Sequence, residues 1–180
     1  SRPRVTSGFV KREGQDELFD AIFTHAEPRT VLTGMRGCGK TQLAAAVAAK
    51  CEDEGWPIVA WINAASRQEL VADLYEFALQ TGIDAPKNIP PETIVRRLLD
   101  QLRSADAADR LFVFDNVENL DDLRGLTPEG NGVRALITTT RHLDWDSLGW
   151  LPLTVGVFER EQSINLLCER TGDNHRNAAD

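Results

Sequence analysis

The chain has 180 residues and a mass of 20.0 kDa, with 42% hydrophobic and 27% charged residues, which suits one globular domain with a buried core. Its 28 acidic and 20 basic residues give a net charge of −8, and this acidity argues against direct nucleic-acid binding. No apolar run approaches the ~20 residues that cross a bilayer, and the first residues lack a signal peptide's apolar stretch. Three cysteines, Cys38, Cys51 and Cys168, lack metal-ligand spacing and fit reduced thiols. We therefore expect a cytoplasmic protein without a membrane partner.

Short apolar runs alternate with longer amphipathic stretches along the chain. This alternation is typical of βα units, and because the runs are mostly continuous they predict strands covered on both faces. The runs span residues 30–34, 58–63, 111–116, 135–140 and 151–158. The sequence therefore predicts an α/β fold, a three-layer α/β/α sandwich around five parallel strands.

Four amphipathic stretches between and after these runs predict helices. They span residues 40–54, 66–80, a segment that begins at Pro91, and 159–170. The first helix carries Leu43, Val47 and Cys51 on one stripe. The second opens with Ser66 and Glu69, the spacing of a capping box.

A glycine-rich motif follows the first predicted strand and opens the first long helix. Residues 34–41 read GMRGCGKT and fit the phosphate-loop pattern G-x-x-x-x-G-K-[ST] in the strand–loop–helix context that the pattern requires. Its glycines allow backbone N–H groups to point at a phosphate, Lys40 would reach the β- and γ-phosphates, and the Thr41 hydroxyl would hold Mg²⁺. A simple Gly-rich turn before a helix is the alternative. The predicted nucleotide contacts are Gly34, Met35, Arg36, Gly37, Cys38, Gly39, Lys40, Thr41 and Gln42.

An acidic residue ends the third predicted strand. Asp115 follows the run LFVF, and a carboxylate there would accept hydrogen bonds from the water shell of Mg²⁺ beside Thr41, unless it only caps the next element. The next residue is Asn116, whose amide can orient a water molecule but cannot accept its proton. Glu118 is either a substitute base or a solvated turn residue. We expect slow hydrolysis, if any.

The fourth predicted strand ends in Thr140 and Arg141. Ligands of open α/β sheets sit at the carboxyl ends of the strands, so Arg141 is placed to distinguish ATP from ADP through the γ-phosphate. The alternative is a surface ion pair of Arg141 with Asp144 or Asp146.

Together these motifs resemble the nucleotide-binding domain of the STAND ATPases, specifically the NB-ARC branch. Segments 9–18, 61–66 and 151–172 extend the resemblance over almost the whole chain. It implies a P-loop NTPase fold in which the strand carrying Arg141 lies between the phosphate-loop strand and the Asp115 strand. It also implies that Val10 and Arg12 lie near adenine and ribose, although Lys11 departs from the family's glycine.

The resemblance implies two parts of the chain: an opening nucleotide-contact motif with a short helix over 1–24, and a nucleotide-binding domain over 25–180. No Gly-Leu-Pro-Leu motif follows the last strand and helix, so we expect the family's helical arm, sensor and effector domains to be absent from this chain.

The implied activity is that of an ATP/ADP switch and weak Mg²⁺-dependent ATPase, which self-associates through the full-length protein when ATP is bound. The candidate catalytic residues are Lys40, Asp115, Asn116 and Arg141, with Thr41 and Asp115 as metal ligands. A working AAA+-like ATPase acting on nucleic acid or protein, a small-molecule phosphotransferase and a binding module without nucleotide are the alternatives.

Overall fold

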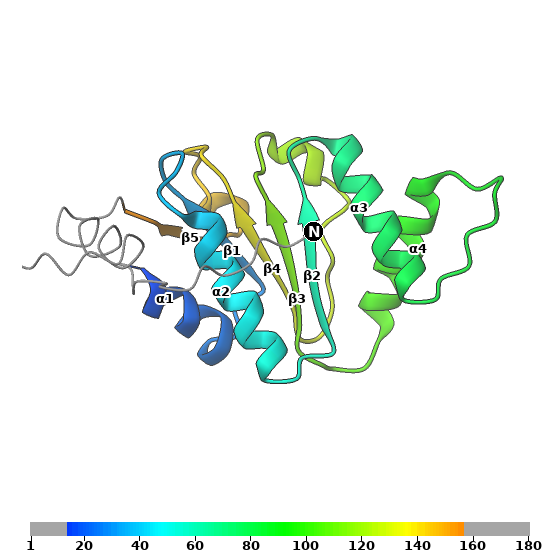
Figure 1. Ribbon diagram of the computed structural model, residues 1–180, viewed down its shortest axis with the longest axis horizontal. Helices are drawn as coiled ribbons and strands as arrows, with labels where there is room; N and C mark the ends of the chain where they lie inside the picture. The colour runs from blue at the N-terminus through cyan, green and yellow to red at the C-terminus, as the bar shows by residue number, and fades with distance from the viewer. Residues whose placement is uncertain (1–13, 157–180) are drawn as a thin grey trace, which may run out of the picture.

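Five parallel strands form the central sheet of the computed structural model, which describes residues 14–156 (Figure 1). The strands are β1 (Arg29–Thr33), β2 (Ile58–Asn63), β3 (Arg110–Asp115), β4 (Val133–Thr138) and β5 (Leu151–Thr154). The longer helices are α2 (Lys40–Asp53), α3 (Arg67–Gln80) and α4 (Pro91–Ser104). The shorter ones are α1 (Gln15–Phe19), the π-helical η1 (Asp20–Thr24), and the 3-10 turns η2 (Leu120–Leu123) and η3 (Asp146–Leu148).

The strand order is β2-β3-β4-β1-β5. As expected, β4 lies between β3 and β1, so the strand that leads to Arg141 separates the strand before the phosphate loop from the strand that ends in Asp115. All neighbouring pairs are parallel. The carboxyl ends of β1, β3 and β4 therefore meet at one edge of the sheet.

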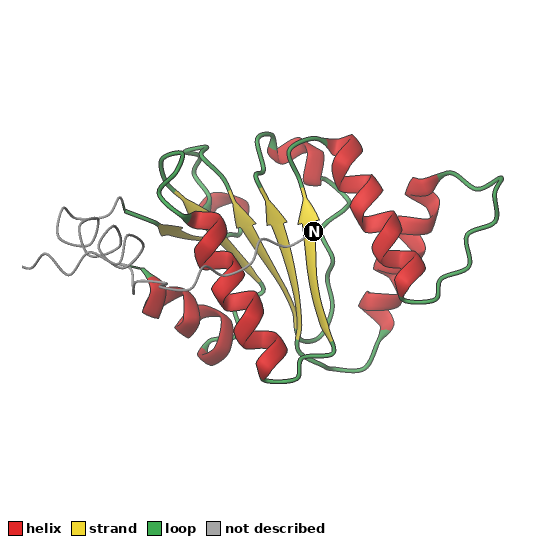
Figure 2. Cartoon of the chain, in the orientation of Figure 1, coloured by secondary structure: helices red, strands yellow, loops and turns green. Residues whose placement is uncertain are grey.

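Helices cover both faces of the sheet, which confirms the three-layer prediction (Figure 2). One core contains side chains of α1, η1 and α2 with Leu111 and Val113 of β3. The other contains side chains of α3 and α4 with Phe112 and Phe114 of the same strand. Successive residues of β3 thus enter opposite cores, which is why its sequence is continuously apolar.

The predicted helix signals form the contacts expected of them. Leu43, Val47 and Cys51 are fully buried on α2. The Ser66 hydroxyl accepts the Glu69 N–H at 3.3 Å and donates to the Glu69 carboxylate at 3.0 Å, so it satisfies a free amide at the start of α3. Pro91 is the first residue of α4, where its missing N–H costs no helical hydrogen bond.

Strand β4 begins and ends two residues before the predicted run. Its second residue is Arg134, whose guanidinium lies 4.6 Å from the Trp56 ring centroid and 2.7 Å from an Asp109 oxygen. These contacts allow a charged residue to be buried in the strand. At the other end, β4 stops at Thr138, although the Thr139 N–H still donates to the Leu32 carbonyl of β1 at 3.0 Å.

The ends of the chain carry several predictions that lie outside the described residues. These are the nucleotide contacts Val10 and Arg12, residues 157–158 of the predicted last strand, and the helix over 159–170. Within the described residues that strand is shorter than predicted, because β5 ends at Thr154. Within residues 14–156, no helix is long and apolar enough to cross a membrane.

Candidate functional site

The loop between β1 and α2 has a backbone that only glycine adopts easily. Gly34, Gly37 and Gly39 have φ angles of 146°, 80° and 93°. A Cβ atom on Gly34 would lie 2.6 Å from the Val155 carbonyl oxygen and 3.0 Å from the Cys38 sulfur. The first glycine of the motif is therefore required both by its φ angle and by the close approach of the chain that leaves β5.

The loop folds around the ammonium group of Lys40. This side chain is 8% exposed, and its Nζ donates to the carbonyl oxygens of Gly34 at 2.9 Å and Met35 at 2.8 Å. The Cys38 sulfur lies 3.8 Å from the same nitrogen. Met35 and Arg36 point to solvent and Cys38 is buried. The structure thus places one buried cation inside a ring of backbone at the start of a 14-residue helix, which is a suitable cradle for a phosphate.

Two threonine hydroxyls meet on the carboxylate of Asp115. Thr41 Oγ1 donates to Asp115 Oδ1 at 2.9 Å, and Thr138 Oγ1 donates to the same oxygen. The Asn116 N–H donates to Thr138 Oγ1 at 2.9 Å. Because an N–H can only donate, this bond makes Thr138 the acceptor there and directs its own proton to Asp115. Thr138 is a site residue that no sequence motif marks, and the run of three threonines at residues 138–140 is the only local signal for it.

The segment after Asp115 is paired with the segment after β4. The Thr139 hydroxyl donates to the Val117 carbonyl at 2.6 Å and accepts the Arg141 N–H at 3.0 Å. Arg141 Nε donates to the Glu118 carbonyl at 2.9 Å. The expected alternative, an ion pair of Arg141 with Asp144 or Asp146, is not formed, although all three residues are described. Thr140 is exposed beside this ladder of contacts.

The donor set at this edge suits Mg²⁺ held together with a phosphate. In the described part of the chain, no cluster of three or more His, Cys, Asp or Glu residues could hold a metal by itself. Thr41 and Asp115 nevertheless bring hard oxygen atoms together, and Mg²⁺ is usually held by one or two carboxylates plus substrate phosphates and water. The residues present therefore fit this metal.

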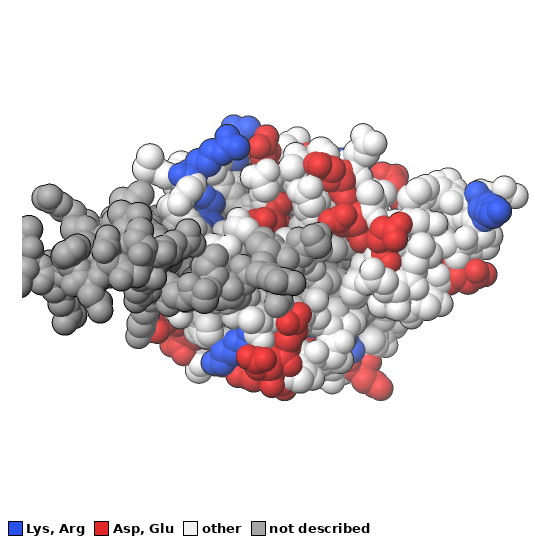
Figure 3. All heavy atoms as spheres, viewed as in Figure 1, with Lys and Arg blue, Asp and Glu red and all other residues white. Residues whose placement is uncertain are grey.

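Charge is unevenly distributed around the site. Figure 3 shows basic side chains gathered where Figure 1 places the loop between β1 and α2, and acidic side chains over α3. A chain with a net charge of −8 therefore presents a local positive region at the phosphate loop, which is the polarity that an anion requires.

Residues 13–177 match the NB-ARC domain. The chain belongs to the NB-ARC family. This confirms the resemblance to STAND-class P-loop ATPases, and it places the protein among nucleotide-binding ATPases. No curated protein compared with the chain matches it.

Solved structures share the fold of this NB-ARC domain at low sequence identity. Cdc6p from Pyrobaculum aerophilum is 17% identical with a TM-score of 0.64, over 96% of this chain and 52% of that chain. A Walker-type ATPase of Pyrococcus abyssi is 15% identical with a TM-score of 0.55, over 99% and 63%. AMPPCP-bound DnaA from Aquifex aeolicus is 13% identical with a TM-score of 0.51, over 96% and 55%. The chain thus spans about half to two thirds of the length of these structures.

Proposed function

We propose that this NB-ARC domain is a nucleotide-operated switch, in which ADP and ATP hold the protein in different states. ADP favours a closed state, and exchange for ATP favours a state that self-associates through the full-length protein. A ligand shifts such an equilibrium only if it binds the two states unequally. The observation that carries the proposal is the hydrogen bond from Arg141 to the Glu118 carbonyl. Arg141 can bind either this carbonyl or a γ-phosphate, so it offers two alternative arrangements.

The proposed roles follow the positions of the residues. Lys40 exchanges its loop carbonyls for β- and γ-phosphate oxygens, and the N–H groups of residues 34–42 surround the phosphates. Thr41 and Asp115 hold Mg²⁺, which supplies neutralisation of phosphate charge when bound. By family resemblance, Val10 and Arg12 lie near adenine and ribose. Thr140 is proposed to lie beside the phosphates because it follows the carboxyl end of β4.

Arg141 is the proposed sensor of the third phosphate. Its present acceptor is a neutral carbonyl oxygen, whereas a γ-phosphate offers a charged and bidentate partner that binds a guanidinium more strongly. ATP, but not ADP, would therefore draw Arg141 away from Glu118. Because Thr139 also binds Val117, such a movement would loosen the segment that follows Asp115.

Slow hydrolysis follows from the residue after Asp115. Asn116 cannot take a proton from the attacking water. The backbone carbonyl of Glu118 accepts a hydrogen bond from Arg141, and the Glu118 side chain is exposed to solvent. Among the described residues, no buried carboxylate therefore follows Asp115 to act as the base. We therefore propose a resetting ATPase with low turnover. The family's helical arm, sensor and effector domains are the proposed recipients of the nucleotide signal.

Nucleotide binding by the chain tests this function directly. We would identify the nucleotide that co-purifies, then measure ATP and ADP affinity and turnover for the wild type and for the Lys40→Ala and Arg141→Ala variants. Lys40→Ala should lose both nucleotides. Arg141→Ala should weaken ATP about tenfold or more, the equivalent of one charge-assisted hydrogen bond, and leave ADP unchanged. Arg97→Ala, on the exposed surface of α4, is the matched control.

Two results would contradict the proposal. Turnover of tens per second would indicate a working ATPase of the AAA+ kind. Equal ATP and ADP affinities before and after the Arg141 substitution would remove the basis for a sensor. Retention of nucleotide by Lys40→Ala would instead reject the phosphate-loop assignment itself.

A further inference from the structure

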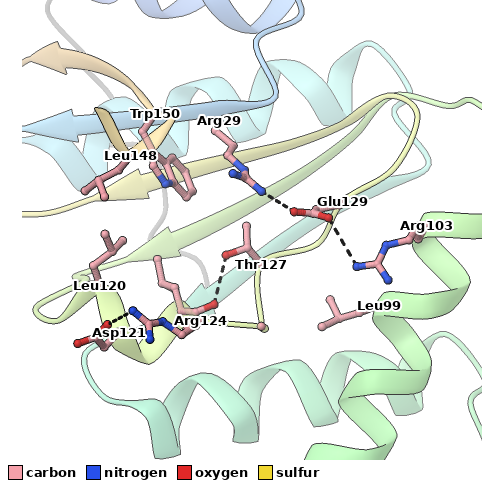
Figure 4. A pocket seen from close by; sticks show the side chains of 12 residues that line it. Arg29, Leu99, Arg103, Leu120, Asp121, Arg124, Thr127, Glu129, Leu148 and Trp150 are labelled. Carbon is pink, nitrogen blue, oxygen red and sulfur yellow. Dashed lines mark hydrogen bonds and ion pairs between the residues drawn. The ribbon is translucent and has the colours of Figure 1, made fainter. Parts of the chain in front are cut away.

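A cleft lies on the sheet face that α4 partly covers, away from the phosphate loop (Figure 4). Its volume is about 290 Å³, close to the lower limit for pockets that bind small molecules or side-chain anchors. Apolar side chains from α4, η2, η3 and the turn before β5 line it: Leu99, Leu120, Leu123, Leu148 and Trp150. Leu148 is 45% exposed, one of the few large apolar side chains within residues 14–156 that face solvent. Short 3-10 turns, not long helices, connect β3 to β4 and β4 to β5 here, so part of the cleft stays open.

A smaller pocket continues the cleft between α3 and α4. It has a volume of about 140 Å³ and is lined by Arg67, Glu92, Arg96 and Leu126. Arg124 and Gly125 line both hollows. We call the two together the arginine groove, because its lining includes Arg29, Arg67, Arg96, Arg103 and Arg124.

The rim of the arginine groove is positive on an acidic molecule. The lining has five arginines and three carboxylates, Asp121, Glu129 and Glu92, which leaves two positive charges in excess, whereas the whole chain carries −8. Each carboxylate is already paired with an arginine of the groove. Arg96 makes no ion pair with any described residue, and each guanidinium has five N–H donors. The rim therefore has unused donors and no unpaired carboxylate.

Figure 4 shows charged and apolar side chains side by side in the cleft. Arg29 and Arg103 point toward Glu129 from opposite sides, and Leu99, Leu148 and Trp150 lie around them. The Arg29 guanidinium also lies 5.9 Å from the Trp150 ring centroid. A ligand that carries both apolar side chains and carboxylates would match both kinds of side chain on this surface.

We propose that the arginine groove binds an acidic, leucine-bearing peptide segment of a protein partner. Leucine-type side chains enter the cleft beside Trp150, and flanking carboxylates bind Arg96 and Arg124. A nucleic-acid backbone fits less well, because it brings no apolar anchor and would meet three carboxylates. The start of β1 lines the groove, whereas the phosphate loop follows the end of that strand. The groove is thus a site separate from that of the nucleotide, and the proposal does not depend on the switch.

Designed peptides would test the proposal on the whole chain. The probe is a labelled amphipathic helix with leucines three and four residues apart and glutamates elsewhere. Its counterparts replace every glutamate by lysine, or every leucine by serine. Fluorescence anisotropy measures affinity, and amide chemical shifts locate the contact. We expect the glutamate peptide to bind with a Kd of roughly 10–100 µM and both counterparts at least about tenfold more weakly.

Adjacent arginines on one helix provide a matched pair of variants. Arg96 and Arg97 are both exposed on α4, but only Arg96 lines the groove. Arg96→Glu and Arg124→Glu should each weaken the peptide about tenfold, and Arg97→Glu should leave it unchanged. Arg67 is kept, because it donates to the Asp122 and Arg124 carbonyls and so supports the fold. Circular dichroism confirms that each variant is folded.

Three results would overturn the proposal: no shift of groove amides at millimolar peptide, an equal effect of Arg96→Glu and Arg97→Glu, or tighter binding of the lysine peptide. Competition by a duplex DNA or single-stranded RNA oligonucleotide that exceeds the glutamate peptide in affinity would assign the groove to nucleic acid instead.

Discussion

The hydroxyl of Thr138 is a single group with two partners at the centre of the site. It donates to Asp115 and accepts from the Asn116 N–H, and its side chain is 1% exposed. Thr138→Val keeps the shape but leaves that N–H without its acceptor, so we expect a loss of about 1–3 kcal/mol in unfolding free energy. We also expect a several-fold higher Mg²⁺ requirement for ATP binding, with metal-free nucleotide affinity unchanged.

Two variants separate these effects from a general cost of losing a hydroxyl. Thr138→Ser should restore both the stability and the Mg²⁺ requirement. Thr30→Val removes an equally buried hydroxyl that has no partner among the described residues, so it should be neutral or stabilising. If Thr138→Val matches Thr30→Val in denaturant melts and Mg²⁺ titrations, Thr138 does not position Asp115.

Asn116 has a backbone conformation that restricts its replacements. Its φ angle is 64°, in the left-handed region where Asn, Asp and Gly are tolerated and branched residues are strained. Asn116→Asp keeps this conformation and adds a proton acceptor after Asp115. We expect its steady-state ATP turnover to rise at least about tenfold. Asn116→Gly keeps the conformation without the carboxylate and is the control; equal turnover of the two variants would show that a missing base does not limit the rate.

Cys51 couples stability to alkaline pH. Burial against the sheet, assisted by the nearby Glu54 carboxylate, raises its pKa from 9.0 to about 12. The unfolded thiol ionises first as pH rises above 9.0, so stability is complete below that pH and is lost between pH 9.0 and about 12. We expect a loss of about 1 kcal/mol at about pH 10. Cys51→Ala should be less stable at neutral pH but should lose less between about pH 8 and 10. Parallel pH profiles of the two proteins in urea melts would contradict this.

At the scale of elements, the phosphate loop and β5 are joined at one glycine. Gly34 and Gly37 both have positive φ angles, but a Cβ on Gly37 meets nothing within 4 Å, whereas one on Gly34 would meet the Val155 carbonyl at 2.6 Å. Gly37→Ala should therefore cost about 1 kcal/mol of strain. Gly34→Ala should cost clearly more and should also weaken ATP and ADP binding, as measured by thermal unfolding and calorimetry. Equal losses of stability in the two variants would show that the Val155 carbonyl can move away from Gly34 at no cost.

Most strands and helices could be predicted because their sequences carry local physical signals. Strand β3 reads as continuously apolar because it enters two cores, and the starts of α3 and α4 are marked by Ser66 and Pro91. The connections through η2 and η3 carry no such periodicity. The early start of β4 depends on Arg134 stacking on Trp56, a contact between residues far apart in sequence.

The candidate site also has one part that the sequence predicts and another that depends on contacts between distant residues. The phosphate-loop motif is linear, so its place between β1 and α2 could be predicted. The contact of Thr138 with Asp115 instead depends on the register that places Phe114 opposite Ile137, and no local pattern specifies that register. The sequence also predicts that Arg141 follows the carboxyl end of a strand. Its hydrogen bond to the Glu118 carbonyl could not be predicted, because it depends on the turn that Asn116 makes after β3.

At the scale of the whole molecule, charge separates two surfaces. A net charge of −8 argued against nucleic acid as a partner, and the structure shows that the basic residues are not spread evenly. Some lie at the phosphate loop and five line the arginine groove. The overall charge therefore describes neither surface, and salt should weaken ligands at each of them separately.

The close approach of Val155 to Gly34 has a mechanical consequence. The backbone leaving β5 touches the phosphate loop at its first glycine and is fixed there by the Val155 N–H donating to Thr33 at 2.8 Å. A phosphate that displaces Gly34 must push on this carbonyl. Val155 thus ties the end of β5 to the first glycine of the phosphate loop, so a ligand that shifts Gly34 would also strain β5.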